Sequence, residues 1–167
     1  MSMRSIGYSF NNAIADIIDN SITAGADLIK IQCLWNGEEP TIEIEDNGKG
    51  MDENELIEAM RPGTKSPLST RSDDDLGRFG LGLKTASFSQ CKKLIVKTYQ
   101  GNLCNQATWD LDIVQKQNKW VLDIEDSLEN NDIKEKGTII RWEKIDTLSK
   151  KNKEDAEENF NSIVSNL

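Results

Sequence analysis

The first element that the hydrophobic pattern predicts is an amphipathic helix over residues 9–23. At 100° per residue, its isoleucines fall on one side and most of its polar residues fall on the other. These residues are Ile14, Ile17, Ile18 and Ile22 on the first side, and Asp16, Asp19, Asn20 and Thr23 on the second. An exposed helix surface normally mixes both signs of charge, whereas this one carries acids, an amide and a hydroxyl. The polar side is therefore either plain solvent-exposed surface or part of a site.

Two alternating segments with an Asn-Gly turn signal between them predict a β-hairpin. The segments cover residues 28–35 and 41–46. In the second strand Ile42, Ile44 and Asp46 share one face, which places a carboxylate at the end of an apolar row. A buried carboxylate needs hydrogen-bond donors. Asp46 therefore either caps the turn that follows it or binds a ligand.

The rest of the chain predicts two more helices, a long loop and four more strands. The helices cover residues 52–60, which begin with a capping-box pattern, and residues 81–89. Residues 61–77 show no periodicity, and so long a loop inside a domain is usually functional or disordered. The strands are expected at residues 94–99, 103–110, 119–124 and 138–145, and a last helical segment is expected after residue 148. We therefore expect an α+β fold, in which helices cover one face of a mixed, largely antiparallel sheet.

Composition limits the chemistry that this chain can perform. Its 167 residues are 37% hydrophobic and 29% charged, and they contain no apolar run near the ~18 residues of a membrane span. The start of the chain has no signal-peptide pattern, so we expect a cytoplasmic protein without a membrane partner. Three cysteines without metal-type spacing are expected to be reduced thiols, two of them in the core. Histidine is absent, which excludes Ser-His-Asp and Cys-His catalysis and a His-ligated zinc within the chain.

The charge distribution points to one basic stretch. The net charge of −9 argues against broad nucleic-acid binding by this segment. Residues 61–84, however, carry five basic and three acidic residues, a local charge of +2. This stretch is either a solvated charged loop or the place where a polyphosphate binds.

Four short motifs occur in a fixed order along the chain. They are Asp16-x-x-x-Asn20, Asp46-Asn47-Gly48-Lys49-Gly50-Met51, Gly77-Arg78-Phe79-Gly80-Leu81-Gly82 and Gly137-Thr138. An acid and an amide four residues apart share a helix face, and a glycine-rich turn before a helix suits phosphates. The glycine spacing matches neither the Rossmann fingerprint nor a P-loop. Lys84, in the first turn of the following helix, either contacts a phosphate or is an exposed helix lysine. Together the motifs predict a nucleotide pocket.

This ordered set resembles the GHKL ATPase superfamily, which includes the ATP-binding domains of DNA gyrase, Hsp-ninety-type chaperones, histidine kinases and MutL proteins. The resemblance covers residues 9–142. It is similar in detail to the chaperone, MutL and microrchidia branches, where an acid-x-x-x-Asn-Ser helix ends in Ala-Gly, as residues 16–25 do here. It implies a Bergerat-type fold with residues 1–148 as the ATP-binding domain. Residues 149–167 would then begin a C-terminal helical extension or a linker to a following domain.

The resemblance also implies roles for individual residues. Asn20 would be the magnesium ligand, and Asp46 would accept a hydrogen bond from the adenine amine. Asp16 falls where the hydrolysing branches have a general-base glutamate, although its side chain is shorter by roughly 1.5 Å; Asp19 is the alternative acid. The other cofactor-binding candidates are Ala24, Gly48, Gly50, Met51, Thr64, Lys65, Gly77, Arg78, Phe79, Gly80, Leu81, Gly82, Lys84 and Thr138.

The resemblance implies a Mg²⁺-dependent ATPase that binds ATP and ADP. Residues 61–78 would form a lid whose closure drives conformational change, with ATP-dependent homodimerisation of a larger protein. The main alternative is a regulatory domain that senses nucleotide and hydrolyses little. A histidine-kinase catalytic domain fits less well, because the first helix has the pattern of the hydrolysing branches and the chain contains no histidine.

Overall fold

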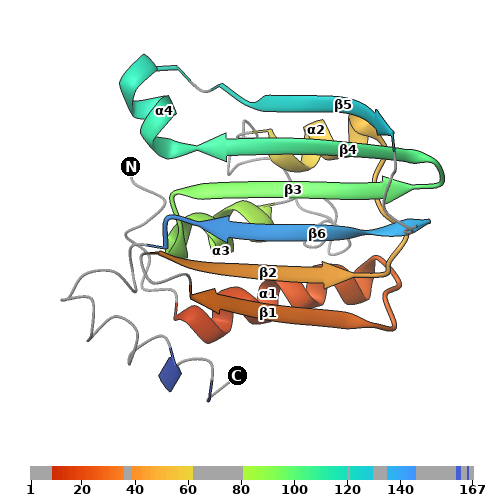
Figure 1. Cartoon of the computed structure of the whole chain (residues 1–167), viewed down its shortest axis with the longest axis horizontal. Helices are drawn as coiled ribbons and strands as arrows, with labels where there is room; N and C mark the ends of the chain where they lie inside the picture. The colour runs from red at the N-terminus through yellow and green to blue at the C-terminus, as the bar shows by residue number, and fades with distance from the viewer. Residues whose placement is uncertain are drawn as a thin grey trace, which may run out of the picture.

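The structure of the chain is a computed structural model, which describes residues 9–35, 39–61, 81–119, 121–129, 135–145, 161, 162 and 165. In this part of the chain, four helices and six strands form one α+β unit, as the sequence predicts (Figure 1). The elements, in chain order, are α1 (Phe10–Thr23), β1 (Ile29–Trp35), β2 (Pro40–Asp46), α2 (Glu53–Met60), α3 (Leu81–Gln90), β3 (Lys93–Gln100), β4 (Leu103–Asp110), α4 (Leu111–Gln117), β5 (Asp123–Glu129) and β6 (Lys136–Glu143).

The six strands form a single sheet in the order β1-β2-β6-β3-β4-β5, and all five pairings are antiparallel. β6, the last strand in the sequence, lies between β2 and β3 in the middle of the sheet (Figure 1). The register pairs Asp46 with Thr138, and Thr138 with Thr98. Three strands that are far apart in the sequence therefore place polar side chains side by side.

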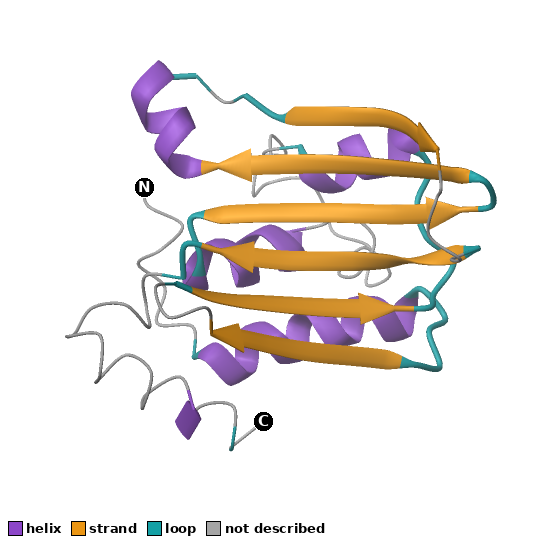
Figure 2. Cartoon of the chain, in the orientation of Figure 1, coloured by secondary structure: helices purple, strands orange, loops and turns teal. Residues whose placement is uncertain are grey.

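Three helices, α1, α2 and α3, cover one face of the sheet (Figure 2). The alternation in β2 follows from this arrangement, because Ile42, Ile44 and Asp46 are buried while the residues between them are half-buried. The opposite face carries ion pairs between neighbouring strands, such as Arg141 Nε to Glu43 Oε2 at 2.8 Å. The predicted inward row that ends in a carboxylate is confirmed.

The core contains large aromatic side chains whose polar atoms are paired. Trp142 donates its ring N–H to Ser87 Oγ at 2.8 Å, and Trp109 donates to the Met60 carbonyl at 3.0 Å. The ring of Phe10 packs edge-on against Trp142 with a centroid distance of 6.1 Å. These contacts attach α1, α2 and α3 to the sheet without leaving a buried indole N–H unpaired.

The first two helices follow the predicted boundaries. α2 has the full capping box, in which Glu55 N donates to Asp52 Oδ1 and Asp52 N donates to Glu55 Oε2. In α1 the predicted apolar side is wrong at one position, since Ile22 is 58% exposed. Ser21 is buried in its place, because its hydroxyl hydrogen-bonds to Asp46 beneath the helix.

The region after β4 differs from the prediction. α4 was not expected there; it begins because Asp110 caps it by accepting a hydrogen bond from Asp112 N at 3.0 Å. Asn118 ends the helix in a left-handed conformation, so β5 begins at residue 123 and not at 119. The seven residues of α4 are too few to show a helical hydrophobic period, so the sequence pattern did not predict this helix.

The structure also bears on the cysteines, on membrane-spanning helices and, in part, on the predicted loop and the last helical segment. Cys91 and Cys104 are buried and Cys33 is half-buried, which confirms two core thiols, and burial raises the pKa of Cys33. Among the described residues, no helix is long and apolar enough to cross a membrane. Of the predicted loop, residues 62–77 lie outside the described part. Of the last helical segment, residues 161 and 162 are helical and most of the remainder also lies outside it.

Candidate nucleotide-binding site

The centre of the candidate site is Asp46, at the end of β2. This residue is only 8% exposed. Ser21 donates its hydroxyl proton to Oδ2 at 2.9 Å, and the Gly48 amide donates to Oδ1 at 2.8 Å. The bond from Gly48 shows that Asp46 caps the turn after β2, which was one of its two predicted roles. Because an ionised carboxylate has about four acceptor positions, these two bonds leave capacity for a further donor such as an amine.

The end of α1 lies against the loop that follows Asp46. Lys49 N donates to the Ala24 carbonyl at 2.9 Å. A Cβ atom on Gly48 would lie 2.9 Å from Ala24 Cβ and 3.0 Å from Asp46 Oδ1, so only glycine fits there. Asn20 precedes Ser21 on this helix and is half-buried, as is Asp16 one turn earlier. The contact thus places the proposed magnesium ligand and the proposed base on the helix that borders Asp46.

Two further glycines allow the backbone of this loop to pack on the sheet. Gly50 has φ +70°, and a Cβ atom there would lie 2.0 Å from the carbonyl oxygen of Tyr99. Gly137 has φ +128°, and its Cβ atom would lie 2.2 Å from the Asp46 carbonyl oxygen. Both positions need glycine for conformation and for space. The glycines of the second and fourth motifs are therefore needed for the backbone packing of the site itself, without any ligand.

A buried threonine joins the loop to β6. Thr98 Oγ1 accepts a hydrogen bond from Met51 N at 2.8 Å and lies 3.3 Å from the Gly137 carbonyl oxygen. The hydroxyl of Thr138 lies 3.5 Å away. Sequence reasoning missed Thr98 and assigned no role to Ser21. The signal for Thr98 was present, since the alternation that ends in Asp46 on β2 also places Thr98 at the end of the inward row of β3.

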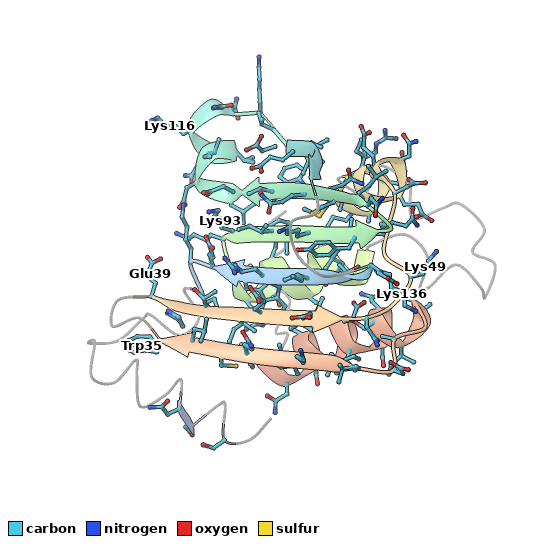
Figure 3. All side chains as sticks on the ribbon, turned by 45° about the vertical axis from the view of Figure 1, so that its right-hand side comes forward. Trp35, Glu39, Lys49, Lys93, Lys116 and Lys136 are labelled. Atoms are coloured by element: carbon cyan, nitrogen blue, oxygen red, sulfur yellow. The ribbon has the colours of Figure 1, made fainter. Side chains whose placement is uncertain are left out.

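These groups lie at one end of the sheet. Figure 1 shows that β2 and β3 end there and that β6 begins there. In Figure 3, Lys49 and Lys136 mark this end, while Trp35 and Glu39 lie at the opposite end. Residues of the second and fourth motifs thus meet, although the chain separates Asp46 from its strand partner Thr138 by 92 residues.

On the candidate phosphate side, Lys84 is not the exposed helix lysine that was one of the two sequence alternatives. It is buried, with 5% of its surface exposed, and it donates to the Arg61 carbonyl oxygen. Burial lowers the pKa of Lys84, and the nearby carboxylate of Glu58 opposes that shift. It is therefore not an exposed helix lysine, and in this structure it ties the start of α3 to the end of α2.

The remaining phosphate-side candidates are only partly described. Gly82 lies in the first turn of α3, where an added Cβ atom would meet nothing within 4 Å, and the first turn contains no acid. Leu81 begins the helix. The candidates outside the described residues are Thr64, Lys65, Gly77, Arg78, Phe79 and Gly80. In the described part of the chain, no group of three or more Cys, Asp or Glu side chains could hold a metal ion.

Comparison with known proteins identifies one matching ATPase family and several similar sequences. Residues 8–139 match the family described as histidine kinase-, DNA gyrase B-, and HSP90-like ATPases. The chain is 35% identical over 89 residues to the chaperone protein HtpG of Helicobacter pylori, covering 47% of this chain and 14% of HtpG. It is 34% identical over 96 residues to the DNA mismatch repair protein MutL of Pseudothermotoga lettingae, covering 55% and 17%. It is 32% identical over 87 residues to the ATPase morc-1 of Caenorhabditis elegans, covering 52% and 10%.

The aligned segments amount to less than a fifth of the length of these three relatives. The family match, in contrast, covers most of this chain and includes all four motifs completely. It extends through Thr138, the last candidate in the sequence, and such a family implies ATP binding. The chain therefore belongs to the histidine kinase-, DNA gyrase B- and HSP90-like ATPases, the GHKL superfamily that its motifs resemble.

Proposed function

We propose that this domain binds ATP together with Mg²⁺ and hydrolyses it slowly, and that the change in nucleotide state drives conformational change in a larger protein. The observation that carries the proposal is the buried Asp46 carboxylate, which has acceptor capacity beyond its two bonds to Ser21 and Gly48. A buried charge with this capacity suits a ligand that offers a hydrogen-bond donor.

In this proposal the adenine lies against the end of β2. Asp46 accepts a hydrogen bond from the exocyclic amine, and Thr138 offers a second polar contact from the neighbouring strand. Met51, which is half-buried and packs against the core, forms an apolar wall for the ring. Gly48 and Gly50 allow the loop backbone to approach the base closely.

The triphosphate would extend from there toward α1 and α3. Asn20 is suited to Mg²⁺ because a hard cation prefers oxygen ligands, and Mg²⁺ usually keeps waters and phosphate oxygens beside one or two protein ligands. When bound, the ion would neutralise phosphate charge. The N-terminus of α3 supplies backbone amides without a competing acid in its first turn. Asn20→Ala should accordingly weaken the affinity for Mg-ATP.

Asp16 is the proposed general base for hydrolysis. It lies one turn before Asn20 on α1 and is half-buried, whereas Asp19 is exposed. A base must lie within about 2.6–3.2 Å of the proton that it removes, or act through a water. Because aspartate is shorter than glutamate, turnover is expected to be slow. This same residue favours a second function, a nucleotide sensor that hydrolyses little.

The arrangement of the larger protein is also part of the proposal. We assign residues 1–148 to the ATP-binding domain and residues 149–167 to the start of a C-terminal extension or linker. Residues 61–78, with Thr64 and Lys65, would form the lid. The full-length protein would be cytoplasmic and would form a homodimer when it binds ATP. Protection of Lys65 from trypsin by a non-hydrolysable ATP analogue would support the lid, and equal cleavage with and without the analogue would contradict it.

The test of the proposed function is thermal unfolding with and without nucleotide. At about 100-fold over the dissociation constant, a ligand that binds only the folded state adds ~2.7 kcal/mol to the free energy of unfolding. Millimolar Mg-ATP and Mg-ADP should therefore raise the melting temperature, and Mg²⁺ alone should not. No shift in a folded sample would contradict nucleotide binding. Phosphate release during a long incubation would then distinguish the ATPase from the sensor.

A further inference from the structure

Thr98 connects three parts of the candidate site, although nothing in its own sequence neighbourhood resembles a nucleotide motif. It is completely buried at the end of the inward row of β3. Its hydroxyl oxygen lies 2.8 Å from Met51 N, 3.3 Å from the Gly137 carbonyl oxygen and 3.5 Å from Thr138 Oγ1. One hydroxyl group thus contacts the loop after Asp46, the turn into β6 and the side chain of Thr138.

The number of available protons gives these contacts a direction. The amide of Met51 can only donate, and the carbonyl of Gly137 can only accept. Thr98 therefore accepts from Met51 and uses its single proton for Gly137. Toward the hydroxyl of Thr138 it has only a lone pair left, so the proton between the two threonines belongs to Thr138. Thr138 then offers any further partner its lone pairs alone.

We infer that Thr98 is a positioning residue that makes the site selective for nucleotides whose base carries an amine at position 6. It does so by holding Thr138 as a hydrogen-bond acceptor and by fixing the backbone of Met51. An acceptor suits the amine of adenine and disfavours the carbonyl of a 6-oxopurine, because two acceptors cannot share a hydrogen bond. This inference rests on the proposed function, and Thr98 itself does not contact the nucleotide.

The test compares the affinities of ADP and IDP, which carry an amine and a carbonyl at position 6. Dissociation constants of the magnesium complexes are measured by isothermal titration calorimetry for the wild type, Thr98→Val and Thr98→Ser. The wild type should prefer ADP. Thr98→Val, which keeps the shape but removes the hydroxyl, should reduce the ADP-to-IDP preference about tenfold, the effect of roughly one hydrogen bond. Thr98→Ser should stay within about twofold of the wild type. Thr108→Val, a half-buried threonine on the opposite sheet face, is the matched control and should change nothing.

The outcomes separate this inference from the proposed function. If the wild type binds neither nucleotide, both fail. If the wild type prefers ADP and Thr98→Val weakens both nucleotides equally, Thr98 is only structural and the inference alone fails. The inference also fails if Thr98→Ser loses the preference for ADP over IDP. If Thr98→Val does not fold, Thr98→Cys decides, because a thiol forms only weak hydrogen bonds. The ADP-to-IDP preference should then fall, and an unchanged preference contradicts the inference.

Discussion

Replacing Asp46 with asparagine tests the adenine contact while changing the fold little. In the wild type, Asp46 accepts hydrogen bonds from Ser21 and from the Gly48 amide. Asparagine keeps one carbonyl oxygen, which can still accept from Gly48. Its amide group would face Ser21, whose hydroxyl can accept that bond and give its own proton to the Ile17 carbonyl, 3.3 Å away. The folded state therefore keeps every hydrogen bond at this position.

The effect on the ligand should be much larger. Asp46→Asn removes the negative charge, and it places a donor or a neutral acceptor where the adenine amine needs a charged acceptor. A hydrogen bond to a charged group contributes roughly 1.5–3 kcal/mol. That free energy corresponds to a dissociation constant raised about 10- to 150-fold for Mg-ADP. The free energy of unfolding without ligand should fall by no more than about 1 kcal/mol, the size of one rearranged neutral hydrogen bond.

Calorimetric titration with Mg-ADP and urea unfolding without ligand measure these two quantities separately. Glu45→Gln is the matched control, because it makes the same acid-to-amide change one residue earlier, on the opposite face of β2. It should leave the affinity within about twofold. If Asp46→Asn binds Mg-ADP as tightly as the wild type does, Asp46 is a turn residue and the adenine assignment is refuted.

Three further variants test other parts of the structure. In full-length protein, Asp16→Asn should reduce hydrolysis by about 10²–10⁴-fold with nearly unchanged nucleotide binding, and an unchanged rate would mean that another group is the base. Gly50→Ala should lower the free energy of unfolding by about 1–3 kcal/mol more than Gly101→Ala in urea titrations, because both have positive φ but only Gly50 lacks space; equal losses would contradict the overlap. The hydrogen bond from Lys144 holds the pKa of Asp112 below its ordinary value, so this pair stabilises the fold above about pH 3.9 and the effect is lost as the pH falls through the lowered pKa. Asp112→Asn should therefore cost roughly 0.2–1 kcal/mol at pH 7 and less in acid, and a cost that does not depend on pH would exclude this pair as its source.

The sequence predicted the elements whose periodicity is long and regular. The first helix and the hairpin follow directly from apolar spacing, and the parity of β2 identified Asp46 as a carboxylate at the end of an inward row. The alternation of β3 places Thr98 at the end of an inward row, but neither this pattern nor the helix pattern around Ser21 shows which group each hydroxyl contacts. Both partners lie across the fold, 25 and 47 residues away in the sequence.

The buried state of Lys84 could not be predicted for a related reason. A lysine in the first turn of a helix is usually exposed, and its burial here depends on the end of α2, 23 residues earlier. Likewise, α4 depends on one cap at Asp110 and is too short for a periodic pattern. Local pattern therefore predicts the elements, whereas tertiary contacts decide which polar side chains become part of the site.

The position of β6 has a consequence for how the protein is made. This strand is the last of the six to leave the ribosome, yet it joins β2 to β3 in the middle of the sheet. Until it is synthesised, the hairpin of β1 and β2 has no strand partner, and Gly137 and Thr138 are absent from the site. Such late, long-range pairing slows folding, because the chain must close large loops before the contacts form. Nucleotide binding during synthesis would accordingly begin only after β6 has emerged, so that it reports a sheet in which β2 and β3 are joined.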